Sequence, residues 1–193
     1  MARRNVLLST LFMTVPRRRQ YDHDTDLARS LWLLAAFGAA LFFALARHTA
    51  ILNPDIPALQ LTFDQAGFQA IIAQWSPEEF SRFRTHFYLD FPFLVTYGLL
   101  GYRLTVLTPR FARATAARDL LSRLLPYAAA LDAIENGLHL ALISTLEVPA
   151  SMFLLAGIVA SVKWILIALF PLGFLGLWAV TRHAPGPRDA DAT

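Results

Sequence analysis

The chain has 193 residues, of which 56% are hydrophobic and only 16% charged, and its mean hydropathy is +0.46. A soluble domain carries about 25% charged residues, so this composition favours a membrane protein, and its high hydrophobicity excludes intrinsic disorder. The lack of cysteine excludes disulfide scaffolds, iron–sulfur clusters and thiolate zinc sites, and the net charge of +3 does not indicate nucleic-acid binding, because the arginines cluster at the ends of apolar segments.

The first segment, residues 1–26, is predicted to be a basic cytosolic arm rather than a signal peptide. Arg3 and Arg4 precede an apolar run, but that run ends in Pro-Arg-Arg-Arg at 16–19 and lacks the small residues of a cleavage site. The run is also too short to cross a bilayer. We therefore expect a retained arm that can lie on the anionic membrane surface.

Four segments are long and apolar enough to cross a membrane as helices, which takes about 20 residues each. They lie within residues 27–180, which we predict to be a single all-α, four-helix transmembrane domain. The tail, residues 181–193, is expected to be disordered and cytosolic. The last span is the longest and can tilt, or bend at Pro171. The predicted spans are residues 27–46, 86–107, 123–146 and 151–180.

The outer loop between the first two spans, residues 48–85, is predicted to be structured. Its centre has the apolar spacing of an amphipathic helix, which Asp64, or Thr62 with Gln65, can cap. The motif Ser-Pro-Glu-Glu at 76–79 predicts that the next helix begins there, outside the membrane, and continues into the second span. The residues with amphipathic spacing are Phe68, Ile71, Ile72 and Trp75.

Arginine placement predicts the orientation. Thirteen of the sixteen arginines lie in or beside the arm, in or beside the loop between the second and third spans, or in the tail. Because positively charged loops stay in the cytosol, we expect both termini to be cytosolic in a multi-pass protein of the bacterial inner (plasma) membrane. The three arginines on the other side are Arg47, Arg82 and Arg84.

The third span carries four polar residues on one helix face. Asp132, Glu135, Asn136 and His139 are spaced at i, i+3, i+4 and i+7, which places them in one stripe. A charged side chain near the bilayer centre costs at least ~2.5–3.5 kcal/mol, so the stripe must face the bundle interior or a wet cavity. The fourth span adds one charge, Lys163, near the same depth as Glu135.

The second span adds further polar groups on one face. Asp90 follows His86 by four residues and precedes Tyr97 by seven, and Pro92 removes a backbone donor beside it. A rise of ~1.5 Å per residue then predicts two layers. The deep layer holds Asp132, Glu135 and Lys163, with Tyr97 near it, and the outer layer holds Asp90, His139 and, as a further candidate, His86.

Three carboxylates in these spans face one lysine. One pair can neutralise itself, so another carboxylate must keep or share a proton, lie in water or hold a cation. A buried protonated acid suits general acid catalysis, and it equally suits proton carriage in a transporter. The simplest alternative is structural, with Lys163 and either Asp132 or Glu135 as an ion pair that sets helix register, and Asn136 and Tyr97 as interhelical hydrogen-bonding groups.

A metal site is a weaker alternative. Glu135 and His139 present two ligands on one face, and Asp90 can add a third. The spacing matches no strong metal motif, however, and Lys163 would compete as the cation. We therefore predict no metal and no cofactor, and His139 is more simply a satisfied core histidine.

Small residues recur within the spans. They are most simply interpreted as points where two helices approach closely, because a small side chain lets backbones come together in a membrane. The residues in question are Gly98, Gly101, Gly157 with Ser161, and Ala35 with Ala39.

The order of motifs over residues 62–165 resembles an uncharacterised family of four-helix bacterial integral membrane proteins. The resemblance implies the topology and no established activity. A looser analogy links the chain to sterol-isomerase and sigma-2-receptor-like bundles, which keep acidic residues inside a helical bundle to meet an apolar ligand. The motifs of the closer resemblance are Phe63-Asp64, Leu89-Asp90-Phe91-Pro92 with Tyr97, Leu131-Asp132-x-x-Glu135-Asn136, and the lone Lys163.

We therefore predict a protein that binds a lipid-like or isoprenoid apolar molecule with a small polar head. Whether it is also an enzyme that transforms this ligand by proton transfer is left open. In the enzymatic version Asp132 or Glu135 is the protonated acid, tuned and oriented by Lys163 and Asn136. The candidate catalytic residues are Asp90, Asp132, Glu135 and Lys163, and the candidate ligand-binding residues are Tyr97, His86, Asn136 and His139.

Two other functions stay open. A proton-coupled transporter or channel needs a water path from the stripe to the cytosolic side, and residues 126–130 offer it no charged group. A non-catalytic partner or assembly protein needs the polar network only as structure. The expected partners are membrane lipids and an apolar small molecule rather than nucleic acid, with a homo-oligomer also left open.

Overall fold

The computed structural model describes residues 17–144 and 148–182, with side chains from residue 25 onward. All regular structure within these ranges is helical, which confirms the predicted all-α class. Four helices are long: α1 (Arg17–Thr49), α4 (Pro77–Leu107), α5 (Thr115–Ser144) and α6 (Ala150–Thr181). The short elements are α2 (Ile56–Gln60), α3 (Gln65–Ile72) and the 3-10 turn η1 (Pro109–Arg113).

Helix α1 begins ten residues before the predicted first span. It starts at Arg17, so residues 17–26 of the predicted arm are helical. Arginine and glutamine are good helix formers, so the basic segment can extend the apolar helix that follows it. The rest of the predicted arm, residues 1–16, and the predicted tail from residue 183 lie outside the described residues.

Two of the long helices are long and apolar enough to cross a membrane. They are the part of α1 from Thr25 to Thr49 and the whole of α6, which correspond to the first and fourth predicted spans. Helices α4 and α5 have the length but a more polar composition, because they carry most of the buried polar residues. By composition the described helices thus support two spans, and four are not established.

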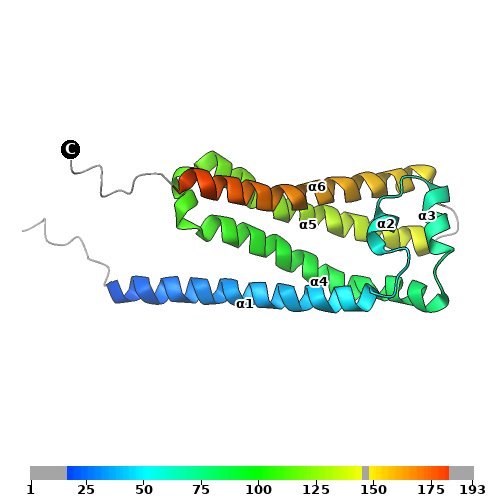
Figure 1. The fold of residues 1–193 in the computed structure, drawn as a ribbon, viewed down its shortest axis with the longest axis horizontal. Helices are drawn as coiled ribbons and strands as arrows, with labels where there is room; N and C mark the ends of the chain where they lie inside the picture. The colour runs from blue at the N-terminus through cyan, green and yellow to red at the C-terminus, as the bar shows by residue number, and fades with distance from the viewer. Residues whose placement is uncertain (1–16, 145–147, 183–193) are drawn as a thin grey trace, which may run out of the picture.

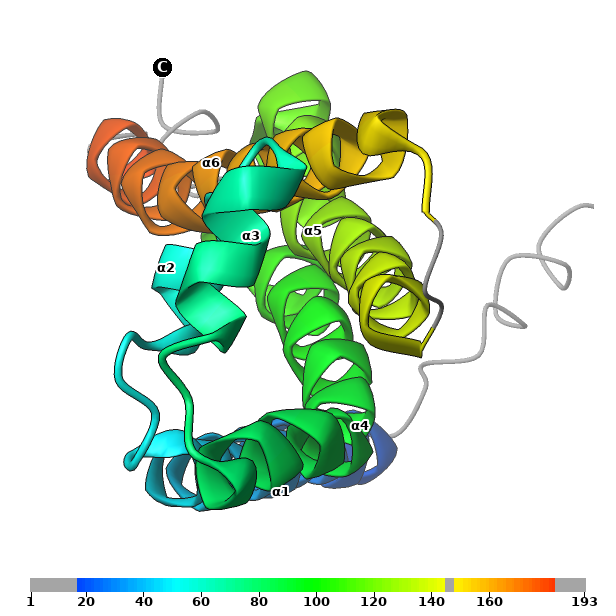
Figure 2. The same cartoon turned by 90° about the vertical axis from the view of Figure 1, so that its right-hand side faces the viewer.

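The four long helices form an open row rather than a closed bundle. Extensive packing joins α1 to α4, α4 to α5 and α5 to α6, and within the described residues no packing of that extent joins α1 to α6. The helices alternate in direction, so α1 starts and α6 ends at the same end of the molecule (Figure 1). Viewed along the helices, the row curves and leaves one side open between α1 and α6 (Figure 2).

Helices α2 and α3 cover the other end of this open side, and we refer to residues 56–72 as the cap (Figure 2). Asp55 accepts a hydrogen bond from the Ala58 amide at 3.0 Å, and Asp64 accepts one from the Gly67 amide at 2.8 Å. The second bond confirms Asp64 as the predicted helix cap. Each side chain accepts a hydrogen bond from a backbone N–H that has no partner within its helix, which stabilises the first turn of these short helices.

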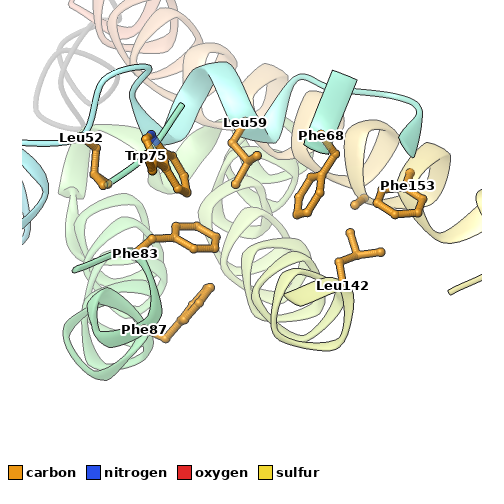
Figure 3. Packing of buried hydrophobic residues seen from close by; sticks show 9 residues of the cluster. Leu52, Leu59, Phe68, Trp75, Phe83, Phe87, Leu142 and Phe153 are labelled. Carbon is orange, nitrogen blue, oxygen red and sulfur yellow. The ribbon is translucent and has the colours of Figure 1, made fainter. Parts of the chain in front are cut away.

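An aromatic core fastens the cap to the long helices (Figure 3). Phe83 of α4 is fully buried, and its ring centroid lies 5.0 Å from that of Trp75. The Trp75 indole donates a hydrogen bond to the Pro54 carbonyl at 2.8 Å, so this buried ring keeps its polar atom satisfied. Buried residues of this core include Leu59, Phe68, Trp75, Phe83, Phe87, Leu142 and Phe153.

The start of α4 at Pro77 confirms the predicted capping motif. The Ser76 hydroxyl accepts a hydrogen bond from the Glu79 amide at 3.3 Å, and the Glu79 carboxylate accepts one from the Ser76 amide at 2.8 Å. Glu79 also accepts a 3.2 Å hydrogen bond from the Asn53 amide, which ties the loop after α1 to α4. Hydrogen bonds from the backbone and hydroxyl of Ser76, with that of Asn53, lower the pKa of Glu79 below 4.5.

We expect Ser76→Ala to lower the free energy of unfolding by about 1 kcal/mol at pH 7, because the amide that the hydroxyl caps loses its partner.

Glu79→Gln should also lower the free energy of unfolding, since the folded state favours the ionised carboxylate. That difference is present above pH 4.5 and should vanish as the pH falls through the lowered pKa of Glu79. Thermal unfolding at several pH values measures both effects. Glu78→Gln, which changes an exposed charge in the same turn, is the control; an equal loss there would contradict the capping argument.

Candidate functional site

The predicted polar stripe of α5 faces the interior. Asp132, Glu135, Asn136 and His139 are all buried, with exposed fractions of 6% or less, and Lys163 of α6 is 2% exposed. The spacing therefore identified the buried face of α5 correctly. The chemical roles assigned to these residues stay predictions, because burial alone does not test them.

Lys163 lies between two carboxylates of α5. Its ammonium nitrogen is 3.0 Å from Oδ1 of Asp132 and 2.6 Å from Oε2 of Glu135, so it pairs with both rather than with one. The contact with Asp132 is also a well-oriented hydrogen bond. Glu135 is held by charge alone, since neither of its buried oxygens accepts a hydrogen bond from the described part of the chain.

Helix α4 supplies two more polar groups to the same cluster. The Tyr97 hydroxyl donates a hydrogen bond to Oδ2 of Asp132 at 3.0 Å. The amide of Asn136 donates one to Oδ2 of Asp90 at 2.5 Å. Each bond joins α4 to α5, so the second predicted span does meet the third through the residues that the sequence singled out.

The two histidines lie on the cap side of the cluster. His139 Nδ1 is 3.6 Å from Oε1 of Glu135, and its ring stacks on Phe68 with centroids 5.9 Å apart. His86 is buried too, but its polar contact is with the Phe83 carbonyl of its own helix. The Phe83 ring contacts both histidines, with ring centroids 5.1 Å from His86 and 6.3 Å from His139.

A cavity of about 470 Å³ lies beside the cluster. The cavity lies on the open side of the helix row. Its walls come from α1 and α4 on one side and from α6 on the other, with α5 behind. Most of its wall is apolar, from Phe42, Phe93, Ile167, Phe170 and neighbouring residues. Its polar wall groups are Gln60, Asp90, Tyr97, Asp132 and Lys163.

The cavity takes groups from both predicted layers. Asp90, Asp132 and Lys163 line it together, whereas His139 and Glu135 do not. Pro92 lies inside α4, which continues to Leu107. The polar residues thus divide into a group that a ligand can touch and a group behind it.

Sequence reasoning missed two polar groups of this site. Gln60 of α2 is 7% exposed, and its carbonyl oxygen accepts a hydrogen bond from the Trp164 indole at 3.1 Å. The bond joins the cap to α6 at the cavity wall. Trp164 follows the lone Lys163 directly, which is the signal that could have marked it, but nothing in the short apolar segment around Gln60 indicates that it points inward.

No metal centre is formed in the described ranges, where no group of three or more histidine, aspartate or glutamate side chains is placed to hold an ion. The alternative set of Asp90, Glu135 and His139 is divided, because Glu135 is paired with Lys163 while Asp90 is bonded to Asn136.

Comparison with known proteins found no matching family model, no similar curated protein and no similar solved structure. The resemblance to four-helix bacterial membrane proteins therefore stays a prediction. Any functional conclusion must come from the site itself.

Proposed function

We propose that all four long helices cross a membrane. Helices α4 and α5 lie between α1 and α6 in the row and run alongside them (Figure 1), so a bilayer that holds the outer pair also surrounds the inner pair. At ~1.5 Å per residue, their 31 and 30 residues are long enough to cross. Their polar groups point inward, whereas exposed residues on them include Val95, Leu99, Ile134 and Leu140.

The orientation that we propose places both ends of the described chain in the cytosol of a bacterial cell. The start of α1, the end of α6 and the turn between α4 and α5 lie at the same end of the molecule (Figure 1). Most of the arginines belong to these parts of the sequence, as the positive-inside rule requires of the cytosolic side. The cap then lies at the outer surface of the inner membrane.

Within this arrangement, we propose that the protein binds an apolar molecule with a small polar head. The observation that carries the proposal is the cavity of about 470 Å³, because it joins a mostly apolar wall to charged groups at one place. Its size lies in the range of small-molecule sites. A molecule can enter sideways from the lipid between α1 and α6, so its apolar part need never cross water.

The charged wall also suits proton transfer to such a ligand. Tyr97, Asp132, Lys163 and Glu135 form a continuous row of contacts of 2.6–3.0 Å from the cavity to the interior. Tyr97 and Asp132 face the cavity and Glu135 lies behind Lys163, so a proton held by the cluster can reach a ligand bound there. An isomerisation or cyclisation that starts by protonation is the reaction class that this row supports.

The test is to purify the protein in native-membrane nanodiscs and identify bound molecules by mass spectrometry. We expect wild type to retain an apolar species enriched over bulk lipid. Ile167→Trp, which fills the cavity, should lose it. The matched control is Ile165→Trp on the same helix, because Ile165 is 56% exposed and faces away from the cavity.

Two results would overturn this function. One is that wild type carries nothing beyond bulk lipid, and the other is that Ile167→Trp retains the same species. Proton uptake into liposomes that is abolished by Asp132→Asn would instead favour the proton-coupled transporter.

A further inference from the structure

We infer that the ligand's head is a protonated amine, so that the molecule is a cationic amphiphile. This inference rests on the proposed function and names the ligand class of the same cavity. It follows from three features of the wall: an acceptor without a partner, an adjoining set of aromatic rings, and an excess of carboxylates over cations.

The first feature is Asp90. Asn136 holds its Oδ2 at 2.5 Å, while Oδ1 accepts no hydrogen bond from the residues that the structure describes. Because Asp90 lines the cavity and Asn136 fixes its carboxylate in place, Oδ1 is a ready acceptor for a group inside the cavity. A negatively charged hydrogen-bond acceptor in an apolar wall favours ligands that carry a hydrogen-bond donor. It favours a positively charged donor most strongly.

The second feature is aromatic. Phe93 and Tyr97 follow Asp90 by three and seven residues on α4, so all three side chains lie on one helix face. The Phe93 ring lies 5.4 Å from that of Tyr97 and 6.0 Å from that of Phe42 on α1. All these rings line the cavity. Aromatic rings beside a carboxylate attract ammonium groups through their negative faces, and do so more strongly where water is scarce.

The third feature is charge. Three carboxylates, Asp90, Asp132 and Glu135, meet the single ammonium of Lys163, which is already paired with two of them. Lys163 therefore has little attraction left for an anionic head, and a carboxylate or phosphate in the cavity would meet like charges. A cationic head instead supplies the missing positive charge beside Asp90. The ligand's apolar part then lies along Ile167 and Phe170 toward the lipid.

The experiment compares four probes that share a dodecyl chain and differ in the head: dodecylamine, dodecanol, dodecanoate and dodecyl phosphate. Competition for the wild-type protein in detergent micelles at pH 7, read by native mass spectrometry, gives their relative affinities. We expect the amine to bind about tenfold more tightly than the alcohol, and both anions to bind more weakly than the alcohol. An anion that binds as tightly as the amine would overturn the inference.

Asp90→Asn tests which group selects the amine. Its amide oxygen can still accept the bond from Asn136, so the fold is preserved, but the atom facing the cavity becomes a neutral donor. We expect the tenfold advantage of the amine over the alcohol to disappear, with alcohol affinity little changed. Asp119→Asn, which removes an exposed carboxylate of α5, is the control and should keep the advantage.

The outcomes separate this inference from the proposed function. If the alcohol binds as tightly as the amine, and Ile167→Trp abolishes binding of both, the cavity is a ligand site but the amine inference is wrong. An amine advantage that survives Asp90→Asn also contradicts the inference. If none of the four probes binds wild type, the proposed function and the inference both fail.

Discussion

Lys163→Met is expected to lower the free energy of unfolding by about 3–5 kcal/mol, the largest single effect we predict. Methionine fills a similar volume but leaves Asp132 and Glu135 buried without their cation. The carboxylates must then take up protons or draw in water, and either response costs stability. Reversible unfolding in mixed micelles, followed by circular dichroism, measures the loss.

A double variant shows that the loss comes from uncompensated charge. Adding Glu135→Gln to Lys163→Met removes one stranded carboxylate, so we expect it to recover part of the lost stability. Val162→Met is the control, because the neighbouring Val162 is 40% exposed and carries no charge. The ion-pair argument would be wrong if Lys163→Met unfolded like wild type, or if the double variant were less stable than Lys163→Met by the full cost of Glu135→Gln alone.

The buried face of α5 could be predicted because a helix has a fixed period. Spacing of i, i+3, i+4 and i+7 puts Asp132, Glu135, Asn136 and His139 in one row whatever the neighbours are, and charge in lipid is too costly for that row to face outward. The start of α4 was equally predictable, since the capping pair Ser76 and Glu79 acts within one turn. Rules that act within a few turns of one helix were therefore sufficient to predict where α4 begins and which residues of α5 form the polar stripe.

Partner choice was not predictable from the same rules. Periodicity says which face of a helix is buried but not how neighbouring helices are rotated, so the bonds of Asp90 to Asn136 and of Tyr97 to Asp132 were not foreseen as pairs. Apolar residues are harder still. Phe42 lines the cavity and the adjacent Phe43 does not, yet both are exposed phenylalanines of α1, so the residue type does not distinguish them.

The open side of the helix row also had no signal in the sequence. Helix α1 packs extensively on α4 alone among the long helices described, and the cap closes the row at one end through contacts that are distant along the chain. The bond between Gln60 and Trp164 spans 104 residues. Another of these contacts involves Gly157, whose nearest neighbours are Thr62 and Phe63. The sequence marked Gly157 as a point of close approach without indicating its partner.

Gly157→Ala is expected to displace the cap and to lower the free energy of unfolding by about 1–3 kcal/mol. A Cβ at this position of α6 would lie 2.4 Å from the carbonyl oxygen of Thr62 and 2.7 Å from the Phe63 ring. The backbone oxygen cannot rotate away as a flexible side chain would, so residues 62–63 must move. Because Gln60 lies two residues earlier, its bond to Trp164 at the cavity wall should weaken as well.

The matched control for this prediction is Gly176→Ala in the same helix, where an added Cβ would have no neighbour within 4 Å. It should leave stability unchanged or raise it by up to about 1 kcal/mol, because alanine is the better helix former. Hydrogen exchange supplies the local measurement: amides of residues 56–72 should exchange faster in Gly157→Ala and at the wild-type rate in Gly176→Ala. Equal exchange in both variants would mean that the cap does not depend on this contact. If exchange is faster in Gly157→Ala alone and this variant also retains less ligand, the close contact between α6 and the cap is needed for the cavity to bind its ligand.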